Sequence, residues 1–269
     1  MTHKRKDPAL RRVAIALAVA VAIIAAGVLL FLLRSPAEEE APSAPTAAEN
    51  EYDPDAFAMR DGFLRYDAAA HMVGIDVSTH QGVIDWQAVA DAGVEFAIVR
   101  VGYRGSTEGK LYEDEQFREN LAGAKAAGLK VGVYFFSQAL DAGEAAEEAG
   151  FACDILDGAA LDLPVFYDWE EVSGGTRVES AASVPMTECA AAFCRAVERQ
   201  GYTAGVYFNQ NYGYGHLELE KLQDYTLWLA EYGDTPGFRY HFDCLQYTDS
   251  GTVAGIEGSV DLDLWIVQE

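Results

Sequence analysis

Residues 130–170 read KVGVYFFSQALDAGEAAEEAGFACDILDGAALDLPVFYDWE, and this stretch decides the fold class. Two near-continuous apolar runs, Lys130–Phe136 and Pro164–Glu170, flank a segment with a helical pattern, Ala142–Leu156. Strands that are apolar along their whole length are typical of parallel sheets with both faces covered. The stretch therefore predicts a strand, a helix and a second strand parallel to the first.

The same alternation continues on both sides of this unit. Further strands are predicted at Met72–Val77, Glu95–Val101, Tyr202–Phe208, Thr226–Tyr232, Phe242–Tyr247 and Ser259–Trp265, and further helices at Asp85–Ala92, Glu113–Ala127 and Thr187–Gln200. Eight strands in about 200 residues predict an α/β fold, a β/α barrel with a mainly parallel eight-stranded sheet. The spacers after the fifth strand are short, so we expect the late helices to be reduced or absent.

The N-terminal region differs from the rest of the chain in composition. Residues Val13 to Leu33 carry no charge, and a helix of that length spans about 30 Å, the hydrocarbon thickness of a bilayer. This predicts an uncleaved transmembrane signal anchor, since a cleaved signal has a shorter apolar region followed by a cleavage site. Residues 1–12 are then a cytoplasmic tail, 34–56 a flexible linker rich in Ala, Pro, Glu and Ser, and 57–269 the β/α-barrel domain.

The charges around the apolar segment give its orientation. Five basic residues precede it: Lys4, Arg5, Lys6, Arg11 and Arg12. Acidic residues follow it closely, so the positive-inside rule places the N-terminus in the cytoplasm. We therefore expect a single-pass protein of the cell membrane whose barrel domain is extracellular.

The chain is strongly acidic, with a formal net charge of −24. Residues 1–34 hold six basic side chains and one acidic one, a contribution of +5, so the remaining residues carry −29. Such a surface repels phosphate backbones, which argues against nucleic-acid partners.

Four cysteines, Cys153, Cys189, Cys194 and Cys244, bear on redox chemistry and metal binding. Outside the cell they could form disulfides in any of three connectivities, or they could be small buried hydrophobic side chains. Cys189 and Cys194 lie five apart in one predicted helix, on different faces, so we expect no bond between them. No C-x-x-C pair or Cys/His cluster indicates a metal site, and no cofactor is expected.

Acidic residues occur at the ends of three predicted strands, namely Asp76, Asp168, Glu170, Asp261 and Asp263. One such acid is more often a helix cap or half of an ion pair, but three strand ends exceed what chance supplies. In a β/α barrel, functional side chains project from the C-terminal strand ends. Asp168 and Glu170 share one face of a strand, with Cα atoms about 7 Å apart. Carboxyl pairs roughly 5–9.5 Å apart are what glycoside hydrolysis requires.

Aromatic side chains cluster near the same strand ends. Flat rings pack against sugar faces and, in tyrosine and tryptophan, offer one polar group. The rings expected to bind substrate are Tyr103, Tyr134, Trp169, Tyr207, Trp228, Tyr232 and Tyr247. Ordinary core packing is the alternative for each ring, and it is the preferred interpretation for Phe136 and for about half of the others.

These motifs together resemble the family 25 glycoside hydrolases, the N-acetylmuramidases. The resemblance covers roughly residues 72–266 and is carried by Gly74-Ile75-Asp76-Val77-Ser78, Gln81-Gly82, Ile84-Asp85-Trp86, Gly102-Tyr103, Gly132-Val133-Tyr134, Asp168-Trp169-Glu170, Gln246-Tyr247 and Val260-Asp261. It implies that Glu170 is the general acid and that Asp76, Asp168 and Asp261 surround it. Many members carry Asn two residues after the last Asp, where this chain has Asp263, which we expect to add negative charge beside the substrate.

The resemblance implies hydrolysis of the β-1,4 bond between N-acetylmuramic acid and N-acetylglucosamine, with peptidoglycan glycan strands as the partner. A chitinase-like hydrolase is an alternative on the same barrel, but those enzymes carry a longer D-x-x-D-x-D-x-E run that this chain lacks. A catalytically silent glycan-binding barrel is a second alternative, which the presence of both Glu170 and Asp76 disfavours.

Overall fold

The computed structural model describes residues 46–181 and 183–267. The predicted cytoplasmic tail, the predicted transmembrane segment 13–33 and residues 34–45 lie outside this range. Across the two described stretches, no helix has the length and apolar character needed to cross a membrane.

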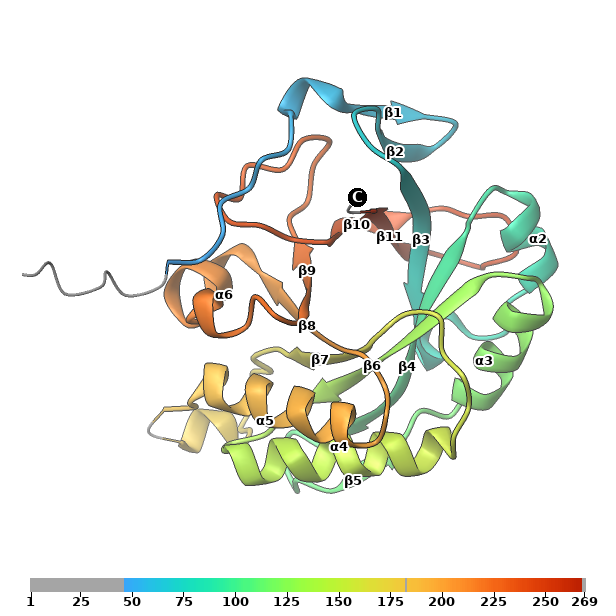
Figure 1. Cartoon of the computed structure of the whole chain (residues 1–269). Coiled ribbons are helices and arrows are strands. Elements are labelled where there is room, and N and C mark those ends of the chain that lie inside the picture. The colour runs from blue at the N-terminus through green and yellow to red at the C-terminus, as the bar shows by residue number, and fades with distance from the viewer. Residues whose placement is uncertain (1–45, 182, 268–269) are drawn as a thin grey trace, which may run out of the picture. The chain divides into compact units, whose positions relative to one another are not determined.

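Eight strands close into a barrel, as the sequence predicts (Figure 1). They are β3 (His71–Val77), β4 (Phe96–Arg104), β6 (Lys130–Ser137), β7 (Val165–Trp169), β8 (Ala204–Asn209), β9 (Thr226–Ala230), β10 (Cys244–Gly251) and β11 (Val260–Ile266). Neighbours from β4 to β10 pair in parallel, and the parallel pair β3–β4 completes the ring. A short strand, β5 (Leu111–Glu113), pairs antiparallel with the end of β4.

The last strand, β11, runs antiparallel to both of its neighbours, β10 and β3. The reason is the length of the connection, since β10 ends at Gly251 and β11 begins at Val260. A parallel crossover needs about a dozen residues or more, whereas a shorter segment returns the chain as an antiparallel hairpin. The sheet is therefore mainly, but not wholly, parallel.

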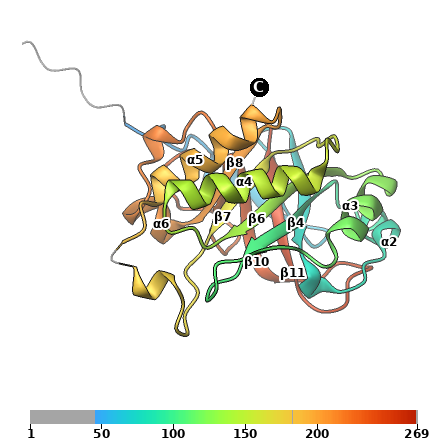
Figure 2. The ribbon, with the colours of Figure 1, turned by 90° about the horizontal axis from the view of Figure 1, so that it is seen from below.

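The four predicted helices are present, and they cover one side of the barrel (Figures 1 and 2). They are α2 (Trp86–Asp91), α3 (Phe117–Ala126), α4 (Ala142–Leu156) and α5 (Met186–Arg199). Beyond β8 the only α-helix within the described stretches is α6 (Gln210–Gly215), so the expected reduction of the late helices is confirmed. Short 3₁₀ turns lie at Pro54–Ala56, Thr79–Gln81, Val178–Ser180 and Leu219–Lys221.

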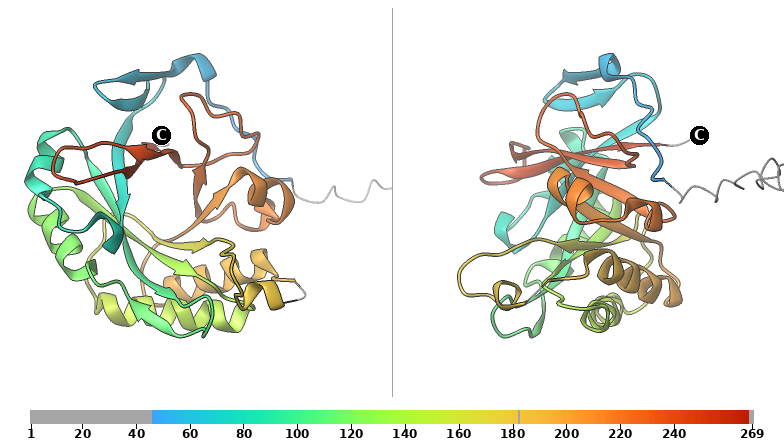
Figure 3. Two further views of the ribbon diagram at one scale, coloured as in Figure 1. Left: turned by 180° about the vertical axis from the view of Figure 1, so that it is seen from behind. Right: turned by 90° about the vertical axis from the view of Figure 1, so that its left-hand side faces the viewer.

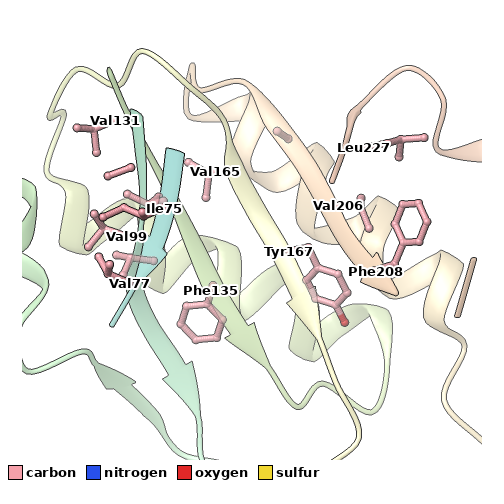
Figure 4. Packing of buried hydrophobic residues seen from close by; sticks show 14 of the residues in the cluster. Ile75, Val77, Val99, Val131, Phe135, Val165, Tyr167, Val206, Phe208 and Leu227 are labelled. Atoms are coloured by element: carbon pink, nitrogen blue, oxygen red, sulfur yellow. The ribbon is translucent and has the colours of Figure 1, made fainter. Parts of the chain in front are cut away.

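Strand alternation divides the core into two shells. Outward-facing side chains such as Val99, Phe135 and Tyr167 pack beneath the helices (Figure 4). Inward-facing side chains form a smaller cluster inside the barrel, which contains Phe96, Phe166 and Trp228. A Cβ on Gly74 would lie 2.3 Å from the Phe96 ring, and one on Gly205 would lie 2.4 Å from Phe166. These glycines therefore let the rings fill the barrel interior.

The domain begins earlier than the sequence indicated. Residues 46–56, assigned to the flexible linker, contact the segment after β9 (Figure 3). The Asn50 amide donates to the Arg239 carbonyl at 2.8 Å, its side chain donates to the Phe238 carbonyl at 3.0 Å, and the Tyr52 hydroxyl donates to the Phe242 carbonyl at 2.5 Å. The composition of 46–56 gave no sign of this, because its partners lie far away in the sequence.

A hairpin that the sequence analysis missed follows this segment. It consists of β1 (Phe57–Arg60) and β2 (Phe63–Tyr66), and its tight turn has positive φ at Asp61 (53°) and Gly62 (84°). Phe57 and Tyr66 pack together with ring centroids 4.6 Å apart.

All four cysteines are buried free thiols. Cys189 and Cys194 lie in α5 without a bond between them, which confirms that prediction. The thiols serve as small apolar core side chains, and burial raises the pKa of Cys153 to about 11.

Candidate active site

A cleft of about 570 Å³ opens where the parallel strands end. Its walls come from most strands of the barrel, because the ends of neighbouring strands converge there. The residues that line it are Asp76, Thr79, His80, Arg100, Tyr103, Glu115, Tyr134, Phe136, Asp168, Glu170, Tyr207, Trp228, Tyr232, Gln246 and Asp261.

The four acids expected to be catalytic all line this cleft. Asp76 and Asp261 are paired residues on the antiparallel strands β3 and β11. Asp168 lies on β7, and Glu170 is the first residue after that strand. Tyr167 and Trp169, which alternate with them, belong to the outer shell. The period-two alternation of a strand therefore places Asp168 and Glu170 on the cleft side.

Asp76 is held by a network that the sequence did not reveal. The Gln246 amide donates to Asp76 Oδ2 at 2.8 Å. Gln246 Oε1 in turn accepts hydrogen bonds from the Tyr207 hydroxyl at 3.1 Å and the Tyr232 hydroxyl at 3.3 Å. These bonds fix which end of the Gln246 amide faces the carboxyl group.

Arg100 supplies a cation at the cleft wall. Its Nε and one terminal nitrogen each lie 2.7 Å from Asp114 Oδ2, and that same oxygen accepts from the Thr79 amide at 3.1 Å. The guanidinium group also lies over the Tyr103 ring, 5.4 Å from its centroid. Arg100 is thereby immobilised, and its charge lowers the pKa of Asp168 against the larger effects of burial.

Burial raises the pKa of each of the four acids expected to be catalytic. The pKa of Asp168 is raised well above its usual range by burial and then by the charge of Glu170. Burial also raises the pKa of Glu170, and the nearby Tyr207 hydroxyl partly offsets this. The pKa of Asp76 is raised by burial and by Asp263, and that of Asp261 rises to about 6 through burial and Asp249. These carboxyl groups therefore keep their protons to a higher pH than free carboxyl groups do, as a general acid requires.

Asp168 Oδ1 is a buried acceptor with no hydrogen-bond partner among the described residues. Burying such an oxygen without a partner costs free energy, and buried acceptors of this kind concentrate at functional sites. A substrate donor entering the cleft would satisfy it.

The aromatic side chains divide into two groups. Tyr103, Tyr134, Tyr207, Trp228 and Tyr232 line the cleft, and so does Phe136, which sequence reasoning assigned to the core. Tyr232 is 56 % exposed, so a sugar can reach its ring.

Two predicted substrate-binding rings, Trp169 and Tyr247, do not line the cleft and belong to the outer shell. The Trp169 indole donates to the Ala139 carbonyl at 3.0 Å, and the Tyr247 hydroxyl accepts from the Leu64 amide at 3.2 Å. Strand alternation explains both positions, because each residue is one place away from a cleft-facing neighbour.

Asp263 does not line the cleft either. It is fully buried inside the barrel, where its Oδ1 accepts from the Trp228 indole at 2.9 Å. It acts on the cleft through its charge, since it raises the pKa of Asp76.

A second pocket, of about 320 Å³, adjoins the first. The two share Glu170, Tyr207 and Tyr232, and the second is also lined by Asn209, Gln210, Asn211, Ala230 and Glu231. Glu170 thus lies on the boundary between two pockets, with space for a sugar on each side.

Sequence reasoning missed the cleft residues Arg100, Gln246, Thr79, His80 and Glu115. Arg100 and Gln246 carried a detectable signal, since each is a polar residue inside an apolar strand, in register with the cleft-facing positions. Within the described stretches, no group of three or more His, Cys, Asp or Glu side chains is arranged to hold a metal ion.

Comparison with known proteins gives one family. The family model described as Glycosyl hydrolases family 25 matches residues 75–256. The chain is similar to a protein of Clostridium acetobutylicum named autolytic lysozyme, with 33 % identity over 193 residues, which cover 71 % of this chain and 55 % of that relative. It is also similar to lysozyme M1 of Streptomyces globisporus, with 27 % identity over 201 residues, which cover 70 % of this chain and 65 % of that relative.

Among solved structures, the fold resembles that of the modular autolysin LytC from Streptococcus pneumoniae. The TM-score is 0.65 at 24 % identity, and the superposition covers 78 % of this chain and 52 % of that one. The described chain therefore corresponds to about half the length of that autolysin, and to 55 % of the clostridial relative.

Proposed function

Because this chain belongs to family 25 of the glycosyl hydrolases, we propose that it hydrolyses the β-1,4 bond between N-acetylmuramic acid and N-acetylglucosamine in peptidoglycan. The lysozyme names of its relatives support this substrate. The acidic surface of the domain would repel an anionic wall, so the sugar contacts of the cleft must supply the affinity.

One observation carries the proposal, namely that Asp168 and Glu170 face one cleft and that Glu170 lies between two pockets. A glycan threaded through both pockets places a glycosidic oxygen beside Glu170. A protonated Glu170 donates its proton to that leaving oxygen, while carboxylate charge stabilises the oxocarbenium-like centre left on the other sugar. Asp168 is the candidate for this second role, because it shares the cleft with Glu170 and because the charge of Arg100 lowers its pKa against the larger effect of burial.

The experiment that tests the proposal is mass spectrometry of peptidoglycan fragments after digestion. Fragments with muramic acid at the reducing end are the expected product. Fragments ending in reducing glucosamine, or cut peptides, would contradict the proposal, and an absence of cleavage would favour a glycan-binding barrel. The anomeric configuration of the first product distinguishes retention from inversion.

We also propose that the protein is anchored in the cell membrane by residues 13–33, with the catalytic domain on the outer side. The uncharged segment and the basic residues before it support this arrangement. Such an anchor would confine hydrolysis to the wall nearest the membrane. N-terminal sequencing of the protein from its native host tests it, because a mature start between Ser35 and Tyr52 would mean that the segment is removed.

A further inference from the structure

The strand that presents Glu170 ends before Glu170 itself. Pairing between β6 and β7 stops at Ser137 and Trp169, and pairing between β7 and β8 stops at Asp168 and Tyr207. Glu170 itself therefore pairs with neither neighbouring strand, although its side chain faces the cleft. Something else must hold this residue if its carboxyl group is to deliver a proton at a fixed place.

Side-chain hydrogen bonds take the place of strand pairing at Glu170. The Gln138 amide, Nε2, donates to the Glu170 carbonyl at 2.6 Å. The Trp169 indole donates to the Ala139 carbonyl at 3.0 Å. The segment after β6 is thus joined to the last residue of β7 and to the residue after it by two hydrogen bonds, one donated from each side. We call Gln138 and Trp169 the clamp.

The orientation of the Gln138 amide is fixed by its surroundings. Gln138 is fully buried, and its Nε2 also donates to the Ser137 carbonyl at 2.8 Å. If the amide were flipped, its oxygen would face two carbonyl oxygens, which is repulsive. Its Oε1 is a buried acceptor with no partner among the described residues, so Gln138 pays a desolvation cost to present the NH₂ group to Glu170.

A buried ion pair between Glu148 and Arg104 holds Ser137, the residue before Gln138. Glu148 of α4 is fully buried and accepts from the Ser137 hydroxyl at 2.6 Å and from Arg104 Nε at 2.7 Å. Arg104 is tied in turn to the Gly109 carbonyl at 2.8 Å and to the Glu144 carbonyl at 3.0 Å. Ser137 is therefore held from α4, and Gln138 follows it in the chain.

We propose that Gln138 and Trp169 are positioning residues for Glu170, which hold the general acid in line with the glycosidic oxygen without touching the substrate. This inference rests on the proposed function. It also gives a role to the middle residue of the D-W-E motif, which faces away from the sugar. Displacement of a reacting group by about 1 Å can cost on the order of 100-fold in rate, so the clamp has a measurable effect on catalysis.

A positioning role differs from a purely structural one in its dependence on the leaving group. Peptidoglycan needs a proton on its leaving sugar oxygen, whereas an aryl glycoside with a dinitrophenolate leaving group does not. A defect in the general acid therefore slows the first substrate and largely spares the second. A general loss of folded protein slows both equally.

The test measures kcat and KM of the full chain on peptidoglycan and on a dinitrophenyl glycoside of an N-acetylmuramic-acid-containing disaccharide. Glu170→Gln shows how far the rate on each substrate falls when the general acid is lost. Gln138→Met keeps the shape of the side chain but cannot donate, and Trp169→Phe keeps an aromatic ring but removes the indole N–H. Ile155→Val is the matched control, because it changes a buried side chain two turns further along the helix that carries Glu148.

We expect Gln138→Met to lower kcat on peptidoglycan by about 10-fold or more, with KM within twofold and activity on the aryl glycoside within about threefold. Trp169→Phe should show the same pattern more weakly, and Ile155→Val should match the wild type on both substrates. Equal losses on the two substrates, or a change confined to KM, would overturn the proposal. If Gln138→Met does not fold, Trp169→Phe decides by the same criteria.

Different results would contradict the proposed function and the clamp. A wild-type protein that releases no muramic-acid-ended fragments contradicts the proposed function. An active wild type whose Gln138→Met variant is unimpaired on peptidoglycan contradicts the clamp alone. A Glu170→Gln variant that loses both substrates equally also overturns the clamp, because Glu170 would then not act as an acid.

Discussion

At the scale of single residues, position relative to the cleft distinguishes acids that the sequence could only group together. Asp76, Asp168, Glu170 and Asp261 line it, whereas Asp263 is sealed beneath Trp228. Glu170 differs from the other acids in lying on the boundary of both pockets. That position, together with a pKa raised by burial, suits it to deliver a proton to a bond that spans the two pockets.

We predict that Glu170→Gln abolishes glycan cleavage while leaving the fold intact. Gln keeps the shape and can donate a hydrogen bond, but it cannot transfer a proton. The expected loss is about 10²–10⁴-fold in kcat, the usual contribution of general acid catalysis. Turbidity assays on purified peptidoglycan measure it, with circular dichroism to confirm folding. Residual activity above about a tenth of the wild type would place the acid elsewhere.

The neighbouring aspartates provide the comparison series. Asp168→Asn should also be severe, because the positive centre loses its nearest anion, and it is measured in the same assay. Asp261→Asn and Asp76→Asn should cost less, since Asp76 is already tied to Gln246. If Asp76→Asn were as damaging as Glu170→Gln, its role would extend beyond orienting the site.

At the scale of elements, the site depends on where strands stop. β7 ends one residue before Glu170, β11 returns antiparallel and brings Asp261 opposite Asp76, and the segment after β9 carries Glu231 to the second pocket. Glu231 accepts from the amides of Gly237 and Phe238 at 2.7 and 3.0 Å, which stabilises this segment locally. Residues 46–56 then hold it from outside.

We predict that residues 46–56 are part of the folded domain. A chain beginning at residue 57 should melt roughly 4–8 °C below one beginning at residue 46. It loses the burial of the Tyr52 ring and several backbone hydrogen bonds, worth about 2 kcal/mol together, for a domain in which 1 kcal/mol shifts Tm by about 2–4 °C. Thermal denaturation followed by circular dichroism measures the difference. Equal melting temperatures would mean that residues 46–56 contribute nothing to the stability of the domain.

At the scale of the whole molecule, the barrel concentrates carboxyl groups in its interior. Asp76, Asp168 and Asp263 are all buried, and burial raises the pKa of each well above its usual range. A carboxyl group whose pKa is raised on folding binds its proton more tightly in the folded state. Its contribution to stability is complete at low pH and is lost as the pH rises through the folded-state pKa.

We therefore predict that the free energy of unfolding falls as the pH rises from about 4 to 7. For Asp261 the window runs from its ordinary value of 3.8 to about 6. Asp263→Asn should flatten this dependence, because Asn keeps an oxygen for the Trp228 indole but carries no charge. At pH 7 the variant should gain at least about 1 kcal/mol, or roughly 3 °C in Tm, and at pH 4 it should match the wild type.

Thermal or urea denaturation at a series of pH values measures this prediction. Cys153→Ala, a change in a thiol outside the barrel interior, serves as a control that should leave the slope with pH unaltered. A variant Asp263→Asn with the same slope as the wild type would show that Asp263 contributes no unfavourable charge to the folded state.

The sequence by itself determined the class of the fold. Apolar runs such as Lys130–Phe136 and spacers with helical patterns are local signals, and β6, α4 and β7 follow them within one or two residues. The period of two along β7 also determined that Asp168 and Glu170 share a face, because alternation is a property of the strand alone. Residues 13–33 stay a prediction of the sequence, outside the described range.

Only the tertiary structure decided which alternating positions face the cleft. Trp169 and Tyr247 lie one residue from cleft-facing side chains, and the barrel turns their faces of β7 and β10 outward, whereas Tyr207 and Trp228 face the cleft. The same closure brings Gln246 to Asp76 across 170 residues of sequence, Gln138 to Glu170 across 32, and Asn50 to Phe238 across 188. No local pattern encodes such contacts, because each is specified by where two distant strands or segments come to lie.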